Sequence, residues 1–211
     1  MDQSLMPPGG SALEAGFRRM VALSRQQPPP TLDERLDRLN RLGVMLAAHE
    51  ARFQEAISTD FGHRAAIETT MAETLLVQGE IKHARKHLKS WMASQRVATQ
   101  PQFWPAKNRL LPQPLGVVGI IAPWNYPLQL TLAPAVAAIA AGNRVMIKPS
   151  ELVPRFSALL KQAIADTFDD SDLVVTDIDG NIAEVFAALP FDHLMFTGST
   201  RVGRLVAEAA G

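Results

Sequence analysis

The stretch that decides the fold is Leu115-Gly-Val-Val-Gly-Ile-Ile-Ala122, with the later segment Arg144-Val-Met-Ile147. The first run is apolar and rich in β-branched residues, and proline flanks it on both sides, which is typical of a strand buried on both faces. Residues 129–141 are apolar nearly all round and predict a helix that covers a sheet, with Pro134 in or near its first turns and Gly142 closing it. Strand, helix and strand joined by short turns predict a βαβ unit and hence a parallel sheet.

Polar residues directly follow three of the predicted strands. They are Trp124-Asn125, Lys148-Pro149-Ser150-Glu151 and, after the apolar strand 193–197, Gly198-Ser199. In open parallel sheets, ligands bind at the carboxyl ends of the strands, so these segments predict a binding site. Glycine allows close backbone approach, and the helix that begins after Ser199 would favour a pyrophosphate at its N-terminus.

Each of these segments also has a purely structural interpretation. Asn125 would then cap a helix or hold a turn, and Ser199 would be an ordinary helix cap. Lys148 and Glu151 would form a surface ion pair that contributes little stability. The residues alone leave both interpretations open.

Three motifs in order carry a family resemblance: Pro123-Trp-Asn-Tyr-Pro127, Ala141-Gly-Asn-Arg-Val-Met-Ile-Lys-Pro-Ser-Glu151 and Phe196-Thr-Gly-Ser-Thr-Arg-Val-Gly203. Together they resemble the NAD(P)-dependent aldehyde dehydrogenases, from about Thr31 to Gly211. The chain is most similar to the branch of short dimeric enzymes that includes the coniferyl aldehyde dehydrogenases. The resemblance implies oxidation of an aldehyde to a carboxylate by a cysteine thiolate, a nicotinamide cofactor and a glutamate-activated water.

The resemblance also implies roles for single residues. Asn125 would form half of the oxyanion hole, since its amide can donate to an oxygen that gains charge. Lys148 and Glu151 would bind the adenosine ribose, and Gly198 and Ser199 the cofactor phosphates. The candidate cofactor-binding residues are Trp124, Lys148, Pro149, Ser150, Glu151, Gly198 and Ser199. Glu151 disfavours a 2′-phosphate whereas Lys148 would accept one, so we expect NAD, and NADP stays open.

Composition narrows the classes of protein. The 211 residues are 47% hydrophobic, and 21 basic residues balance 21 acidic ones, so no net charge favours nucleic acid. No apolar run approaches the roughly 20 residues of a membrane helix, and Met1–Gly10 lacks the features of a signal peptide. We therefore expect a cytoplasmic protein without nucleic acid or membrane partners. The resemblance implies a small-molecule aldehyde as its substrate.

Cysteine is absent, which excludes disulfides and cysteine metal sites. The nucleophile of the resembled family is therefore absent too. We expect a truncated cofactor-binding domain whose catalytic domain is missing, without turnover by itself. The full-length protein would be a homodimer. A non-catalytic nucleotide-binding module and a purely structural or interaction protein are the alternatives.

The predicted fold class is α/β, a doubly wound parallel, Rossmann-like sheet preceded by a helical segment. Residues 1–30 form a flexible arm with one short helix, capped by Ser11 with Glu14. Residues 31–211 form the NAD(P)-binding domain, which divides into a helical part (31–99), an extended segment (100–114) and the parallel α/β part (115–211). Within 31–99 we predict helices from Thr31 to about 49 and from 50 to 59, then mostly helix over 64–94 with Met71, Leu75, Ala84, Leu88 and Met92 buried.

Two other patterns in the sequence, a pair of kinase-like motifs and a basic helix face with two histidines, do not predict a function. Asp60-Phe-Gly62 and Val145-Met-Ile-Lys148 resemble kinase motifs, but their order along the chain is reversed. The basic residues of segment 82–89 are typical of a solvated helix face. His83 and His87 are spaced to share a metal, but there is no cysteine and no third ligand nearby, so no metal is expected.

Overall fold

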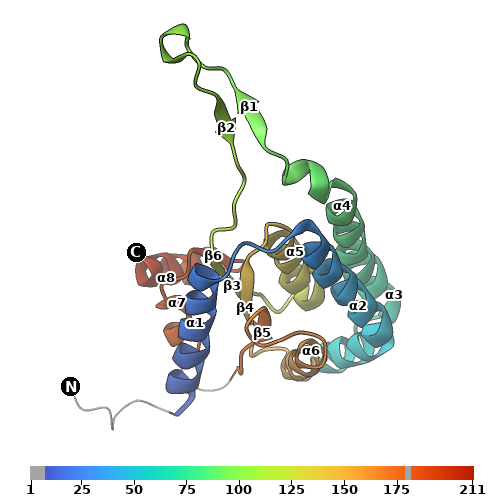
Figure 1. Cartoon of the computed structure of the whole chain (residues 1–211). Helices are drawn as coiled ribbons and strands as arrows, with labels where there is room; N and C mark the ends of the chain where they lie inside the picture. The colour runs from blue at the N-terminus through green and yellow to red at the C-terminus, as the bar shows by residue number, and fades with distance from the viewer. Residues whose placement is uncertain (1–7, 179–181) are drawn as a thin grey trace, which may run out of the picture.

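A four-stranded parallel sheet forms the centre of the computed structural model, which describes residues 8–178 and 182–211 (Figure 1). Its strand order is β5 (Leu173–Val175), β4 (Arg144–Lys148), β3 (Val117–Ile121) and β6 (His193–Phe196). All five residues of β3 and of β4 are buried, as their continuous apolar sequence predicts. The predicted doubly wound α/β fold is confirmed.

Helices cover both faces of the sheet. Val118 and Ile120 of β3 face the larger core, which is built with α2 (Leu32–Phe61), α4 (Leu75–Trp91), α5 (Pro127–Ala140) and α6 (Pro154–Ala165). Val117 and Ile121 point to the opposite face, where α1 (Pro8–Gln26) and α7 (Ile182–Ala187) pack, and α8 (Thr200–Ala210) lies beside β6 (Figure 1). Side chains of a strand alternate between faces, so an all-apolar strand supplies two cores at once.

Helix α2 is one helix of 30 residues, whereas the sequence analysis divided it near residue 50. That division was wrong because no proline or glycine interrupts the chain between Gly43 and Gly62, and Phe53 and Ile57 continue the buried stripe. Its start is as predicted, since Thr31 and Glu34 form the reciprocal capping box. Its end is also as predicted, with Gly62 in the left-handed conformation at φ 84°.

The helical region that follows departs from the prediction. After the short α3 (Ala66–Thr69), residues Thr70–Thr74 form a turn of π-helix, η2, before α4 begins. Met71 and Leu75 were predicted to be buried but are 61% and 48% exposed, while Glu73 is fully buried. A π turn holds more residues than an α turn, so it rotates the buried face and breaks the extrapolated spacing. Ala84 and Leu88 are buried as predicted.

Two predicted helix starts were wrong. Helix α1 begins at Pro8, ahead of the predicted start at Ser11. In α5 the first helical position belongs to Pro127, and Pro134 lies in the middle of the helix. Proline suits the first position because its missing N–H has no partner there in any case.

The segment predicted to be extended forms part of a protruding arm (Figure 1). Strand β1 (Gln95–Val97) pairs antiparallel with β2 (Asn108–Leu110), and a short 3₁₀ turn, η3 (Pro101–Phe103), lies between them. Trp104 and Leu110 are among the apolar residues that this arm exposes.

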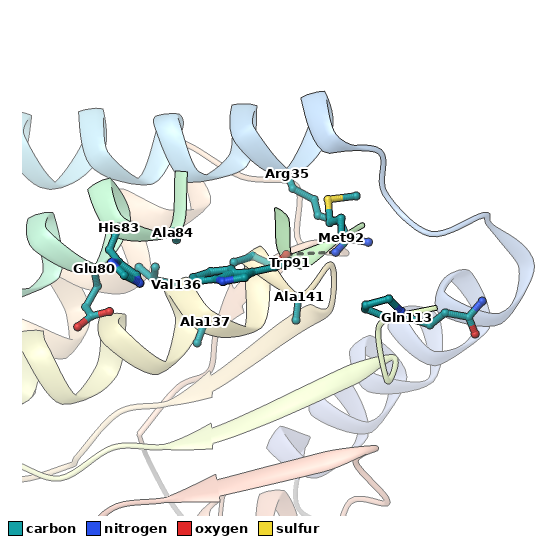
Figure 2. Close-up of a pocket in the computed structure, with 12 residues that line it drawn as sticks. Arg35, Glu80, His83, Ala84, Trp91, Met92, Gln113, Val136, Ala137 and Ala141 are labelled. Atoms are coloured by element: carbon teal, nitrogen blue, oxygen red, sulfur yellow. Dashed lines mark hydrogen bonds between the residues drawn. The ribbon is translucent and has the colours of Figure 1, made fainter. Parts of the chain in front are cut away.

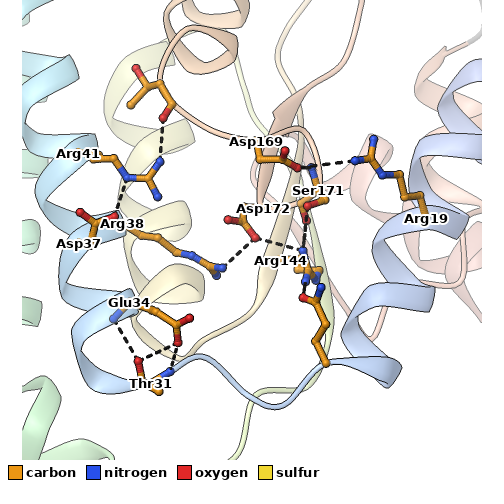
Figure 3. A network of polar contacts seen from close by, with 12 residues as sticks. Arg19, Thr31, Glu34, Asp37, Arg38, Arg41, Arg144, Asp169, Ser171 and Asp172 are labelled. Carbon is orange, nitrogen blue, oxygen red and sulfur yellow. Dashed lines mark hydrogen bonds and ion pairs between the residues drawn. The ribbon is translucent and has the colours of Figure 1, made fainter.

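A polar network joins α1 and α2 to the turn before β5 (Figure 3). The carboxylate of Asp172 accepts hydrogen bonds from Arg38 of α2 at 2.9 Å and from Arg144 of β4 at 3.1 Å. Arg144 also donates to the carbonyl of Ser171 at 2.6 Å, and Arg19 of α1 pairs with Asp170 at 2.9 Å. These contacts lie at the amino-terminal edge of β4, away from the loops predicted to bind a ligand.

The turn between α5 and β4 requires glycine. Gly142 has φ 89°, and a Cβ there would lie 2.5 Å from the guanidinium carbon of Arg35, whose Nη1 donates to the carbonyl of Ala140 at the end of α5. We expect Gly142→Ala to lower the free energy of unfolding by about 1–3 kcal/mol, since it adds backbone strain and displaces Arg35. Urea unfolding measures this change.

The matched control is Gly79→Ala, in the middle of α4, where a Cβ meets nothing within 4 Å. That substitution should raise the free energy of unfolding by about 0.5–1 kcal/mol, because alanine favours a helix interior. Equal effects at the two positions would contradict the proposed strain at Gly142.

Candidate functional site

Three loops meet at the carboxyl-terminal edge of the sheet. Ile121 at the end of β3 is in register with Lys148 at the end of β4 and with Phe196 at the end of β6. The segments that follow these residues therefore start side by side. The chain builds outward from β3 to β4 and β5 and then places β6 on the other side of β3, so the strand order reverses between β3 and β6. Such a reversal is where ligands bind in open α/β sheets.

Lys148 and Glu151 form a close pair in the loop after β4. Lys148 is buried, and its Nζ donates to Oε2 of Glu151 at 2.6 Å. The Glu151 side chain is 58% exposed, so the pair carries a carboxylate to the surface beside the loop of β3. The hydrogen bond from Lys148 is the main cause that holds the pKa of Glu151 below its ordinary value.

This pair predicts a pH effect on stability. Because the pKa of Glu151 is lowered in the folded chain, its contribution to stability is present above the unfolded pKa and is lost as the pH falls through the folded pKa. We expect the unfolding free energy of the wild type to fall more steeply than that of Glu151→Gln between about pH 5 and about pH 3. Parallel curves from chemical unfolding at several pH values would contradict this coupling.

The other two residues of this loop have structural contacts. Pro149 is buried. The Ser150 hydroxyl accepts a hydrogen bond from the N–H of Leu152 at 3.2 Å, and its carbonyl accepts one from the Ser157 hydroxyl at 3.0 Å. These contacts fix the turn that connects β4 to α6, so Ser150 shapes the loop from within.

The loop after β6 contains the N-cap of α8 and a glycine that lies close to an aromatic ring. Ser199 is the N-cap of α8, and its hydroxyl accepts from the N–H of Val202 at 3.4 Å, as the structural interpretation expected. A Cβ at Gly198 would lie 2.4 Å from the ring of Phe196, so a larger residue there would displace this ring. Helix N-termini preceded by glycine are a common arrangement for binding phosphate groups, which makes this loop a candidate for that role.

Trp124 and Asn125 are exposed at the end of β3. The Trp124 ring packs against Phe61 with a centroid distance of 5.9 Å. Helix α5 receives no cap from the side chain of its N-cap residue, Tyr126, and its first N–H groups instead donate to a carboxylate of Glu73. Asn125 therefore does not cap α5.

Two further residues of this region have no signal in the sequence that predicts their role. Glu73 lies in the π turn and is fully buried, and Arg64 lies just before α3 with its Nη1 donating to the Asn125 carbonyl at 2.8 Å. No local pattern marks them, because a π turn has no clear sequence signature and both contacts span more than 50 residues.

Three pockets of the described part of the molecule lie outside these loops. One, of about 250 Å³, is lined by Trp91 of α4, Val136 and Ala141 near the end of α5, and Arg35 (Figure 2). This pocket lies at the carboxyl-terminal end of α5, whereas Asn125 lies next to the amino-terminal end of the same helix. A second, of about 530 Å³, is lined by Gly116 and Arg144 at the amino-terminal edge of the sheet. A third, of about 340 Å³, lies between α6 and residues 176–178, which follow β5. Within residues 8–178 and 182–211 no cluster of acidic or histidine side chains is arranged to hold a metal ion.

Comparison with known proteins identifies the family. The model of the "Aldehyde dehydrogenase family" matches residues 21–211. The chain belongs to the aldehyde dehydrogenase family. A probable coniferyl aldehyde dehydrogenase of Pseudomonas aeruginosa is 44% identical over 198 residues, which cover 94% of this chain and 42% of that protein. A coniferyl aldehyde dehydrogenase of Pseudomonas sp. strain HR199 is 40% identical and is covered to the same 42%.

Solved structures agree with this family assignment. The substrate-bound AldH of Staphylococcus aureus has a TM-score of 0.89 and 36% identity, over 94% of this chain and 43% of that one. Aldehyde dehydrogenase C of Pseudomonas syringae, solved with NAD+ and octanal, has a TM-score of 0.80 and 25% identity. The chain spans less than half the length of these aldehyde dehydrogenases. Within its described part, no helix is both long and apolar enough to cross a membrane.

Proposed function

We propose that this chain supplies the cofactor-binding and oxyanion residues of an NAD(P)-dependent aldehyde dehydrogenase, which oxidises an aldehyde to a carboxylate. The observation that carries the proposal is the meeting of three family motifs at one edge of the sheet, where β3, β4 and β6 end in register. Family membership supports the reaction type.

In this proposal each loop has a role. Lys148 and Glu151 bind the hydroxyls of the adenosine ribose, and Gly198 and Ser199 receive the phosphates. Trp124, Pro149 and Ser150 complete the site as its wall and loop supports. Asn125 donates from its amide to the oxygen that gains charge during addition to the aldehyde. A nicotinamide cofactor held by these residues would supply the acceptor for the hydride.

The charges of the site support NAD as the proposed cofactor. The Glu151 carboxylate is at the surface and would repel a 2′-phosphate, which favours NAD. The Nζ of Lys148 donates a hydrogen bond to Glu151 at 2.6 Å, so it attracts a 2′-phosphate less than the ammonium of an unpaired lysine does. NADP is the weaker candidate.

Two observations shape the rest of the proposal. The chain contains no cysteine, so we propose that it has no dehydrogenase turnover by itself, since the family reaction needs a thiolate nucleophile. Two relatives are named for coniferyl aldehyde, which supports an aromatic aldehyde as the substrate of the whole protein. We further propose that the whole protein is a cytoplasmic homodimer.

The absence of cysteine also favours a second candidate, a nucleotide-binding module without catalysis. Both candidates predict cofactor binding, and they differ in what happens when an aldehyde is added. Formation of NADH by the pure chain with an aldehyde would contradict the proposed lack of turnover and exclude the second candidate.

Titration of NAD+ with detection of tryptophan fluorescence tests the binding site. The chain has three tryptophans, of which only Trp124 lies in the three loops. Trp91 lines the pocket at the carboxyl-terminal end of α5, and Trp104 lies between β1 and β2. We expect quenching in the wild type and its loss in Trp124→Phe, with quenching retained in Trp104→Phe. Absence of quenching in the wild type would count against both candidates.

A further inference from the structure

A buried ion pair lies directly behind the loop that carries Asn125. Glu73 is fully buried in the π turn Thr70–Thr74, and the side chain of Arg64 is 4% exposed. Their charged atoms, Arg64 Nη1 and Glu73 Oε1, are 3.2 Å apart. Neither residue belongs to the three loops, yet both contact the segment that runs from Asn125 into α5.

Glu73 holds the start of α5. Its Oε2 accepts hydrogen bonds from the backbone N–H of Leu128 at 2.6 Å and of Gln129 at 3.0 Å. These N–H groups belong to the first turn of the helix, where no carbonyl within the helix can reach them. A carboxylate is favoured there by the helix dipole as well. Glu73 thus fixes the position of the helix that begins two residues after Asn125.

Arg64 holds the loop itself. Its Nη1 donates to the backbone carbonyl of Asn125 at 2.8 Å. Its guanidinium also lies over the ring of Tyr126 at 4.7 Å and over that of Phe61 at 5.1 Å. Since Phe61 packs against Trp124 in turn, the residues on both sides of Asn125 are tied to Arg64.

Stability alone is a weak reason for such a pair. Burial raises the pKa of Glu73 against the opposing effects of the backbone N–H donors and Arg64, which is the signature of a costly desolvation. An apolar pair of similar volume is often as stable as a buried ion pair or more so. Its geometric effect is the feature that apolar side chains cannot reproduce, because they offer no donor to the Asn125 carbonyl and no acceptor to the N–H groups of α5.

We propose that Glu73 and Arg64 are positioning residues that set the orientation of Asn125 in the oxyanion site. The proposal rests on the proposed function for the role of Asn125, but its geometric content does not depend on it. A positioning residue must control where the Asn125 amide points, in addition to keeping α5 folded.

The test compares Glu73→Gln with Glu68→Gln in the 211-residue chain. Glu68 is the matched control, because it is the other carboxylate near Arg64, at 3.4 Å, but its side chain is 53% exposed. In Glu73→Gln one amide NH₂ must face either Arg64 or the N–H groups of α5, so a donor meets a donor. The readouts are the side-chain amide signals of Asn125 and the indole N–H signals of the tryptophans in ¹H–¹⁵N spectra.

We expect Glu73→Gln to shift the Asn125 amide and Trp124 indole signals by more than their linewidths, while the indole signals of Trp91 and Trp104 stay in place. Glu68→Gln should leave all of them unchanged. Unchanged Asn125 and Trp124 signals in Glu73→Gln would overturn the proposal, and so would equal shifts in Glu68→Gln.

A second variant, Arg64→Lys, tests the proposal if Glu73→Gln does not fold. Arg64→Lys keeps the positive charge but removes the planar fork that contacts both the Asn125 carbonyl and Glu73. It should again shift the signals of Asn125 and Trp124 alone. If both variants unfold, the pair serves the whole fold and the proposal fails. These outcomes are independent of cofactor binding, so failure of wild-type NAD+ titration would reject the proposed function without deciding this inference.

Discussion

Replacing Lys148 with alanine is expected to weaken NAD+ binding by about tenfold to a hundredfold. In the proposed site Lys148 binds a ribose hydroxyl and orients Glu151, which it contacts at 2.6 Å. A hydrogen bond that involves a charged group contributes about 1.5–3 kcal/mol, and each 1.4 kcal/mol is roughly a factor of ten in affinity. Isothermal titration calorimetry with NAD+ measures the change in dissociation constant.

Lys161→Ala is the matched control for this substitution. Lys161 is also a lysine paired with a carboxylate, that of Asp177, but it lies on α6 outside the three loops. Its replacement should leave the affinity for NAD+ within a factor of two or so, since surface ion pairs contribute little. An unchanged affinity in Lys148→Ala, or an equal loss in both variants, would contradict the assigned role of Lys148.

Phe156→Ala is expected to lower the free energy of unfolding by about 3–5 kcal/mol, the usual cost of removing a buried aromatic ring. Phe156 is fully buried in α6 and packs against Phe53 of α2, with ring centroids 5.8 Å apart. Asp60 of α2 holds the first turn of α6, because its carboxylate accepts a hydrogen bond from the N–H of Phe156 at 2.9 Å. The pair of rings therefore joins the helical segment to the helix that follows the Glu151 loop.

Chemical unfolding of Phe156→Ala measures this cost, and Leu152→Ala serves as the control. Leu152 lies four residues earlier but is 61% exposed, so its loss should change the free energy of unfolding by less than about 0.5 kcal/mol. A loss below about 1 kcal/mol in Phe156→Ala would mean that α2 and α6 do not share one cooperative core.

The central part of the fold could be predicted because its signals are local. The apolar runs of β3 and β4 are unbroken, so burial on both faces follows from the residues themselves. The capping box of Thr31 and Glu34 and the stop at Gly62 likewise depend on neighbours in the chain. The position of the candidate loops follows from a general rule on parallel sheets.

The rest depends on contacts that local patterns do not encode. The π turn at Thr70–Thr74 rotates the helix face, so the spacing that predicts burial of Met71 and Leu75 fails beyond it. Glu73 then enters the interior because the N–H groups of α5, more than 50 residues away, give its carboxylate partners. Charged residues are usually predicted to be exposed, and only the tertiary structure reveals such a partner.

The most direct test of the central claim is a map of ¹H–¹⁵N chemical shifts during titration of NAD+ into the chain. If the ends of β3, β4 and β6 form the cofactor site, the largest shifts fall on residues 122–126, 148–151 and 197–200. Shifts concentrated around Trp91 and the end of α5, at Gly116 and Arg144, or at residues 176–178 would place the ligand in a pocket away from these loops. That result, or a spectrum that NAD+ leaves unchanged, would contradict the account.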